Sequence, residues 1–136
     1  DWPGLAKITA LRAAPDARRI SILAGNGGLF LPEELDRGAD GAMTGFAYPE
    51  MMIDVCKAHA AGDRERARDI FDAYLPLARY EQQPGLGLAI RKHVLARRGA
   101  IASPALRQPG SKLSAADIAD IKTLIARQER RLGGLG

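Results

Sequence analysis

The sequence predicts an α/β fold that is the end of a larger sheet or barrel. Two short apolar runs have the length of strands, at 19–25 and 40–45. Helical patterns flank and separate them, at 3–14, 31–38 and 49–62. This alternation is typical of parallel strands joined by helical crossovers. Because two strands leave both edges of a parallel sheet uncovered, we do not expect the chain to be a complete domain.

The first helix and the first strand have recognisable boundaries. Apolar residues recur every third position within 3–14, with Asp1 as the expected N-cap and Pro15 at the expected end. The run 19–25 contains β-branched residues and predicts a buried strand. The short helix at 31–38 has glutamates in its first turn, where the helix dipole stabilises negative charge.

The rest of the chain is predicted to be helical. The helix at 49–62 places Met52, Val55 and Cys56 on one apolar face. Cys56 on such a face is interpreted as a small core residue, and a role as a nucleophile is the weaker alternative.

Three further helices are expected, at 63–83, 86–99 and 114–133. Asp63 is the expected N-cap of the first of them. Ser114 begins the last, with an acidic residue three positions later, which is a variant of the capping box.

Composition and charge favour an ordinary globular protein. Of the 136 residues, 46% are apolar and 26% are charged, and the net charge of +4 is spread along the chain. This small excess gives little support for binding to nucleic acid or a membrane, and no run approaches the ~18 apolar residues of a membrane span. Cys56 cannot form an internal disulfide, so we expect a reducing, cytoplasmic setting. His59 and His93 have no partners at metal-ligand spacing, so no metal or cofactor is expected.

Several segments, in order, resemble the dihydrodipicolinate synthase/N-acetylneuraminate lyase family. They are LAGN at 23–26, GADGA at 38–42 and AGDRERARDIFDAYLPL at 61–77. Members of this family are (β/α)8 TIM barrels that join a lysine to a 2-keto acid, usually pyruvate, as a Schiff base. The resemblance implies that residues 1–62 are the last βα units of the barrel, with strands seven and eight. Residues 63–136 would then be the C-terminal helical extension.

The resemblance also implies that the catalytic lysine lies before Asp1. Lys7 is a tempting alternative, because it follows GLA near the start of the sequence. The stretch from Lys7 to Gly25 is too short to hold a strand end, a helix, a loop and another strand. We therefore expect Lys7 to be a solvated helix residue and the chain alone to be inactive. No catalytic residue is assigned within the chain.

By the same resemblance, the loops after the two strands form a wall of the 2-keto-acid pocket. The substrate-binding residues expected there are Gly25, Asn26, Gly27, Gly28, Met43 and Thr44. Glycines let main-chain groups approach the keto acid closely, and Met43 is expected to cover the methyl group of pyruvate. Sugar-acid lyases of the family carry carboxylates where this sequence has Gly27 and Gly28. Their loss argues against a long polyol and favours aldol chemistry or dehydration of a smaller 2-keto-3-deoxy acid.

Some interpretations stay open. A phosphate-binding loop at 25–28 would need a G-x-G-x-x-G or GK[ST] pattern, which the sequence lacks, whereas Asn-Gly is compatible with a plain turn. The aromatic residues Phe71, Tyr74 and Tyr80 belong either to the core or to the interface of a homo-oligomer. The expected partners are the 2-keto acid and the remainder of the barrel. The alternative function is a non-catalytic scaffold or interaction module derived from the same barrel.

Overall fold

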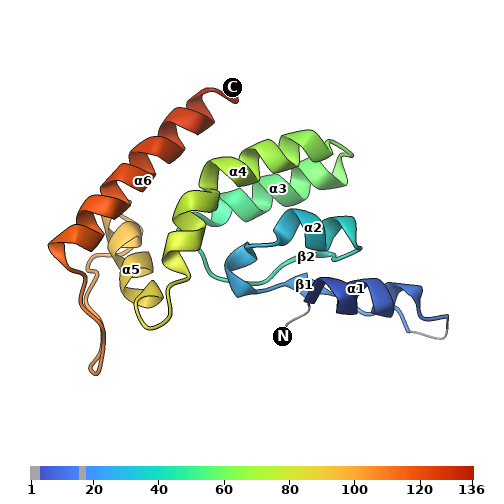
Figure 1. Cartoon of the computed structure of the whole chain (residues 1–136), viewed down its shortest axis with the longest axis horizontal. Coiled ribbons are helices and arrows are strands. Elements are labelled where there is room, and N and C mark those ends of the chain that lie inside the picture. The colour runs from blue at the N-terminus through green and yellow to red at the C-terminus, as the bar shows by residue number, and fades with distance from the viewer. Residues whose placement is uncertain (1–3, 16–17) are drawn as a thin grey trace.

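A computed structural model describes residues 4–15 and 18–136, which form a mostly helical molecule (Figure 1). The expected N-cap Asp1 lies outside the described residues. In sequence order the elements are α1 (Gly4–Ala13), β1 (Leu23–Ala24), the 3-10 helix η1 (Asn26–Gly28), α2 (Leu31–Asp36), β2 (Gly41–Ala42), α3 (Pro49–Ala60), α4 (Arg64–Glu81), α5 (Gly87–Arg97) and α6 (Ala115–Gly133).

The two strands pair in parallel, as the alternation predicts. Leu23 lies opposite Gly41 and Ala24 opposite Ala42, and α2 lies in the connection between the strands. The predicted strands at 19–25 and 40–45 were too long. Within the described residues each strand has a partner along one edge only, and the ladder extends over two residues in each strand.

The two faces of the strand pair differ in exposure. Ala24 is 1% exposed, whereas Leu23 is 48% exposed and Met43 is 75% exposed. Alternate residues of a strand point to opposite faces, so one face is covered by helices and the other is open in the described part of the molecule. The prediction of a buried strand at 19–25 is therefore wrong for Leu23, because no described element covers its side of the pair, and for Ile20, which lies outside the strand and is 52% exposed.

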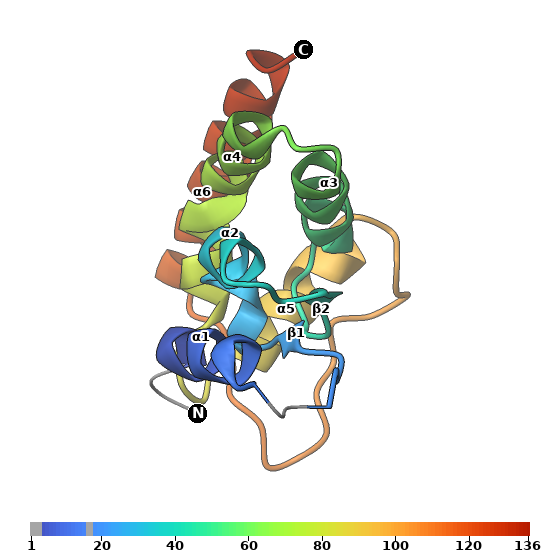
Figure 2. The ribbon, with the colours of Figure 1, turned by 90° about the vertical axis from the view of Figure 1, so that its right-hand side faces the viewer.

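Three of the helices, α2, α3 and α4, form a layer on one side of the strand pair. Both views show α3 and α4 on the same side of the strands, with α2 next to them (Figures 1 and 2). At the left of Figure 1, α5 and α6 lie beyond α4, away from the strands. The core lies between these helices. Its largest fully buried side chains are Leu31, Met51, Leu77, Ile90, Ile121, Glu81, Val55 and Val94.

The predicted helix starts in the second half of the chain are confirmed. The Asp63 carboxylate accepts a hydrogen bond from the Arg66 N–H at 3.0 Å and caps α4. Ser114 and Asp117 form the reciprocal capping box of α6, in which each side chain accepts a hydrogen bond from a backbone amide. The division of the sequence at residue 62 stays a prediction.

Core positions of α3 and α4 agree with the apolar patterns. Cys56 packs against the core, and burial raises the pKa of its thiol, which disfavours the reactive thiolate. Phe71 and Tyr74 are buried, and Tyr74 lies edge-on to Phe46 with ring centroids 6.3 Å apart. Tyr80 is half-buried and donates a hydrogen bond to Asp120 of α6 at 3.1 Å.

Candidate functional site

The loops that follow β1 and β2 meet at one end of the strand pair. Parallel strands bring their carboxyl ends to the same edge, so Gly25 and Met43 leave the strands on the same side. The Gly27 N–H donates a hydrogen bond to Thr44 Oγ1 at 2.7 Å. This bond joins the two loops directly.

The segment 25–28 forms a tight turn. The φ angles of Asn26, Gly27 and Gly28 are 49°, 68° and 72°, all in the left-handed region that favours glycine and asparagine. The Gly28 N–H donates to the Gly25 C=O at 2.9 Å and closes the turn. The left-handed backbone of this segment therefore explains why it consists of asparagine and glycine.

Packing explains the glycine at position 27 independently of any substrate. A Cβ atom on Gly27 would lie 2.1 Å from Nε2 of Gln82, the residue that follows α4. Any side group at position 27 would thus point into the helical layer. By contrast, a Cβ atom on Gly25 would have no atom within 4 Å.

A cavity of about 700 Å³ reaches the first of these loops. It lies between α1, β1 and α2 and is lined by Gly4, Leu5, Ile8, Ile22, Leu23, Gly25, Asn26, Phe30 and Glu34. Glu34 is the titratable group of this lining. Burial and the neighbouring Glu33 carboxylate raise the pKa of Glu34.

An ion pair from α4 and α5 holds the second loop. Glu81 Oε2 accepts from the Ala47 N–H at 3.0 Å, and Glu81 Oε1 accepts from Arg91 Nε at 2.5 Å. Arg91 Nη2 donates to the Gly45 C=O at 2.7 Å. Burial raises the pKa of Glu81, while its bonds to Arg91 and to the Ala47 N–H act in the opposite direction.

A second arginine supports the same loop from its other end. Arg98 donates hydrogen bonds to the Ala47 C=O and to the Glu50 carboxylate. Its guanidinium group also lies 4.0 Å from the centre of the Tyr48 ring. The loop between β2 and α3 is therefore anchored by residues that follow it by many positions in the sequence.

The structure brings together most of the predicted site residues. Gly25 and Asn26 line the cavity, and Gly27 and Gly28 lie buried behind them. Thr44 is half-buried and joins the loops, whereas the exposed Met43 does not line the cavity. Lys7 lies on the exposed side of α1, as expected for a helix residue.

Three residues around these loops were not predicted from the sequence: Glu34, Glu81 and Arg91. The only signal for Glu34 was its place in the first turn of a helix, where glutamate is common. A signal did exist for Glu81, since it continues the apolar face of its helix at helical spacing.

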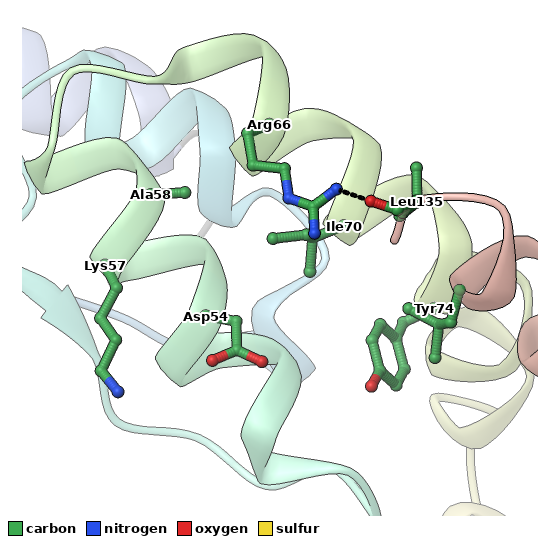
Figure 3. Close-up of a pocket in the computed structure, with 8 residues that line it drawn as sticks. Asp54, Lys57, Ala58, Arg66, Ile70, Tyr74 and Leu135 are labelled. Atoms are coloured by element: carbon green, nitrogen blue, oxygen red, sulfur yellow. Dashed lines mark hydrogen bonds between the residues drawn. The ribbon is translucent and has the colours of Figure 1, made fainter.

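Another cavity, of about 340 Å³, lies among helices α3, α4 and the end of α6 (Figure 3). Arg66 donates a hydrogen bond to the backbone carbonyl of Leu135 at its rim (Figure 3). Burial and the Glu50 and Asp54 carboxylates raise the pKa of Tyr74. The lining residues include neither strand-end loop, so we do not assign the candidate site to this cavity.

Neither histidine belongs to a metal-binding arrangement in the described part of the molecule. His59 bonds to Asp36 at 2.9 Å, and His93 lies on α5. Across residues 4–15 and 18–136, no cluster of three His, Cys, Asp or Glu residues could hold a metal ion. The same residues contain no helix with the length and hydropathy needed to cross a membrane.

Comparisons with known proteins agree on one kind of structure. Dihydrodipicolinate synthase from Rhodopseudomonas palustris is 52% identical, with a TM-score of 0.90 over 93% of this chain and 43% of that enzyme. The 4-hydroxy-tetrahydrodipicolinate synthase from the thermoacidophilic methanotroph Methylacidiphilum fumariolicum SolV is 22% identical, with a TM-score of 0.80. The match covers 98% of this chain and 44% of that enzyme. Dihydrodipicolinate synthase from Oceanobacillus iheyensis is 19% identical, with a TM-score of 0.76 over 93% of this chain and 43% of that enzyme.

The last two of these matches show the fold alone, whereas the first also shows close sequence similarity. The chain spans less than half the length of each solved structure that it matches. No protein-family model matches the sequence, and no curated protein matches it.

Proposed function

The chain belongs to the dihydrodipicolinate synthase family, and on this premise we propose that it forms part of a Schiff-base lyase or synthase. The substrate of that enzyme is pyruvate or a related 2-keto acid. One observation carries the proposal: 52% identity to the Rhodopseudomonas palustris enzyme over 93% of the chain.

In this proposal β1 and β2 are strands seven and eight of a (β/α)8 barrel. The open face of the pair, with Leu23 and Met43, turns toward the barrel interior, where residues of the remaining strands cover it. The exposure of these apolar residues supports the proposal, because the interior of such a barrel is filled by apolar side chains of its strands. The full protein is expected to form a homo-oligomer.

This polypeptide supplies a wall of the pocket and no catalytic group. Gly25 and Asn26 present main-chain groups to the keto acid, and Met43 covers its methyl group. Thr44 holds the two loops together through its bond to Gly27. In such barrels substrates bind at the carboxyl ends of the strands, which is the end where these residues lie.

The chemistry begins on a lysine that we expect before Asp1. Its amine adds to C2 of the 2-keto acid and water leaves, which gives an imine that accepts electrons from C3. Proton removal then permits carbon–carbon bond formation, bond cleavage or loss of a hydroxyl group. Lys7 is an unsuitable alternative, because it lies within α1 on its exposed side, outside the strand ends.

The loop also bears on the size of the substrate. A Cβ atom at position 27 would meet Gln82, and one at position 28 would approach Met52 and Thr44. Neither position offers a carboxylate to substrate hydroxyl groups. A short 2-keto or 2-keto-3-deoxy acid is therefore a better candidate than a long polyol.

Trapping of the imine tests the proposed function. The full-length polypeptide is incubated with pyruvate and sodium borohydride, and the adduct is mapped by peptide mass spectrometry. We expect a reduced pyruvyl adduct on a lysine that precedes Asp1, and none when borohydride is omitted. The absence of any adduct with pyruvate and with longer 2-keto acids would favour the non-catalytic scaffold. An adduct on Lys7 would contradict the proposed place of the lysine.

A further inference from the structure

The end of α4 carries a carboxylate that faces the protein interior. Glu81 is 1% exposed and follows Tyr74 and Leu77 on the buried face of the helix. Both of its carboxylate oxygens are bonded, one to the main chain of Ala47 and the other to Arg91. The Arg91 side chain is 31% exposed, so the pair extends from the core to the surface.

Stability alone does not explain this ion pair. Removing a carboxylate and a guanidinium from water is costly, and well-packed apolar residues often serve the folded state equally well. The atoms that the pair contacts suggest another role. Besides their mutual bond, both residues bind the main chain of the same loop, at Gly45 and at Ala47.

The two bonds fix the loop in position. Glu81 accepts from the N–H of Ala47, and Arg91 donates to the C=O of Gly45, so the peptide units on both sides of Phe46 are held. Phe46 itself is 5% exposed and lies in the core. The segment can therefore shift only if a buried aromatic ring and two charge-assisted bonds are disturbed.

We propose that Glu81 and Arg91 are positioning residues that hold Gly45 and Ala47 and thereby place Met43 and Thr44 against the bound 2-keto acid. This inference rests on the proposed function. Met43 and Thr44 directly precede the held segment, so the helical extension sets the geometry of the site through the main chain. Neither charged residue needs to touch the substrate.

The fit at Gly45 supports this role for Arg91. A Cβ atom on Gly45 would lie 2.2 Å from Arg91 Nη1, so the guanidinium group occupies the space beside this glycine. The residue that follows Glu81 is Gln82, which packs in the same way beside Gly27 of the first loop. Residues at the end of α4 and within α5 thus contact both loops of the candidate site.

The test compares variants of the full-length polypeptide with pyruvate as the probe. The half-saturating pyruvate concentration and the maximal rate of borohydride trapping are measured for the wild type, Arg91→Lys and Glu81→Gln. Arg68→Lys is the matched control, because Arg68 is an ion-paired arginine of α4 that bonds Asp36 and Glu65. Thermal unfolding is followed for each protein in parallel.

We expect the half-saturating concentration to rise about tenfold in both variants, with the maximal rate within about twofold of the wild type. Tenfold corresponds to the loss of about one charge-assisted hydrogen bond. Lysine cannot replace the fork of Arg91, which donates to Glu81 and Gly45 from separate nitrogen atoms. The control is expected to match the wild type.

Each other outcome is informative. A lower unfolding temperature with unchanged pyruvate saturation would overturn the positioning role and leave the proposed function intact. No adduct in the wild type would overturn the proposed function and this inference with it. If the single variants do not fold, the double variant E81Q/R91M leaves no unpaired buried charge, and the same comparison applies to it.

Discussion

The Gly27 N–H and the Thr44 hydroxyl oxygen are 2.7 Å apart, and their hydrogen bond ties the loop after β1 to the loop after β2. Gly27 is buried, so its N–H depends on this partner within the protein. The conformation of the glycine turn is therefore coupled to the position of the second loop. A change at either loop is expected to affect both.

Replacing the Thr44 hydroxyl tests this coupling. Thr44→Val removes the acceptor and leaves the Gly27 N–H without its partner, so we expect a loss of about 1–3 kcal/mol in the free energy of unfolding. Thr44→Ser keeps the hydroxyl and is expected to retain most of that stability. Urea unfolding measures both. Equal stabilities of the two variants would show that the bond contributes nothing.

Substitutions in the turn at 25–28 separate the cost of a left-handed backbone from the cost of a steric collision. Gly28→Ala places alanine in the left-handed region, where an L-residue costs about 1–2 kcal/mol. Gly27→Ala adds a collision with Gln82, so we expect it to be the more destabilising variant. Gly25→Ala serves as the control, because Gly25 has a φ angle of −111° and a Cβ atom there would have open space.

A second substitution isolates the steric part. In the Gly27→Ala background, Gln82→Ala removes the colliding group and is expected to restore stability only to the level of Gly28→Ala. The free energy of unfolding in urea measures this recovery. Full recovery to the wild-type value would mean that the left-handed backbone at position 27 costs nothing.

Stability at acid pH is expected to depend on Asp40, the residue that precedes β2. A hydrogen bond from Arg19 and one from the Ile22 N–H, at 2.5 and 2.8 Å, hold the pKa of Asp40 well below its ordinary value of 3.8. A lowered pKa in the folded state stabilises the protein above pH 3.8, and this stabilisation is lost as pH falls through the folded pKa.

The comparison of Asp40→Asn with the wild type measures this contribution. We expect the difference in unfolding free energy to be constant near neutral pH and to shrink below about pH 3.8. Asp69→Asn is the control, because the Asp69 side chain, on α4, has no hydrogen bond or ion pair with another described residue. A difference that stays constant down to low pH would contradict the role of Asp40.

Substrate preference is expected to respond to a carboxylate at position 25. Gly25 lines the cavity and has open space at Cβ, so Gly25→Asp is expected to favour hydroxylated 2-keto acids over pyruvate in the full-length enzyme. Gly27→Asp would instead direct its carboxylate at Gln82 and disturb the turn. Ratios of kcat/KM for a short and a hydroxylated 2-keto acid measure the effect. Unchanged ratios in Gly25→Asp would contradict a site at this loop.

The helices could be predicted from the sequence because their signals are local. The caps at Asp63 and Ser114 and the apolar face of α4 depend on residues a few positions apart. The strands could not be predicted as well. Whether Ile20 and Leu23 are buried depends on which elements cover them, and the described residues supply no such element.

The candidate site could be predicted only in part, for a similar reason. The glycine turn has a local signal in Asn26 and Gly27, and the structure confirms a turn there. The residues that hold the second loop have no local signal in the sequence, because Arg91 lies 46 residues after Gly45. Glu81 could have been suspected from its place on an apolar helix face, but its partner depends on how α5 follows α4.

A crystal structure of the borohydride-reduced pyruvate adduct of the full-length polypeptide would show whether the loops after β1 and β2 form a wall of the 2-keto-acid site. We predict that the reduced pyruvyl group lies on the open face of the strand pair, in contact with Met43 and with the turn at 25–28. An adduct that contacts neither Met43 nor this turn would show that the two loops are not a wall of the site.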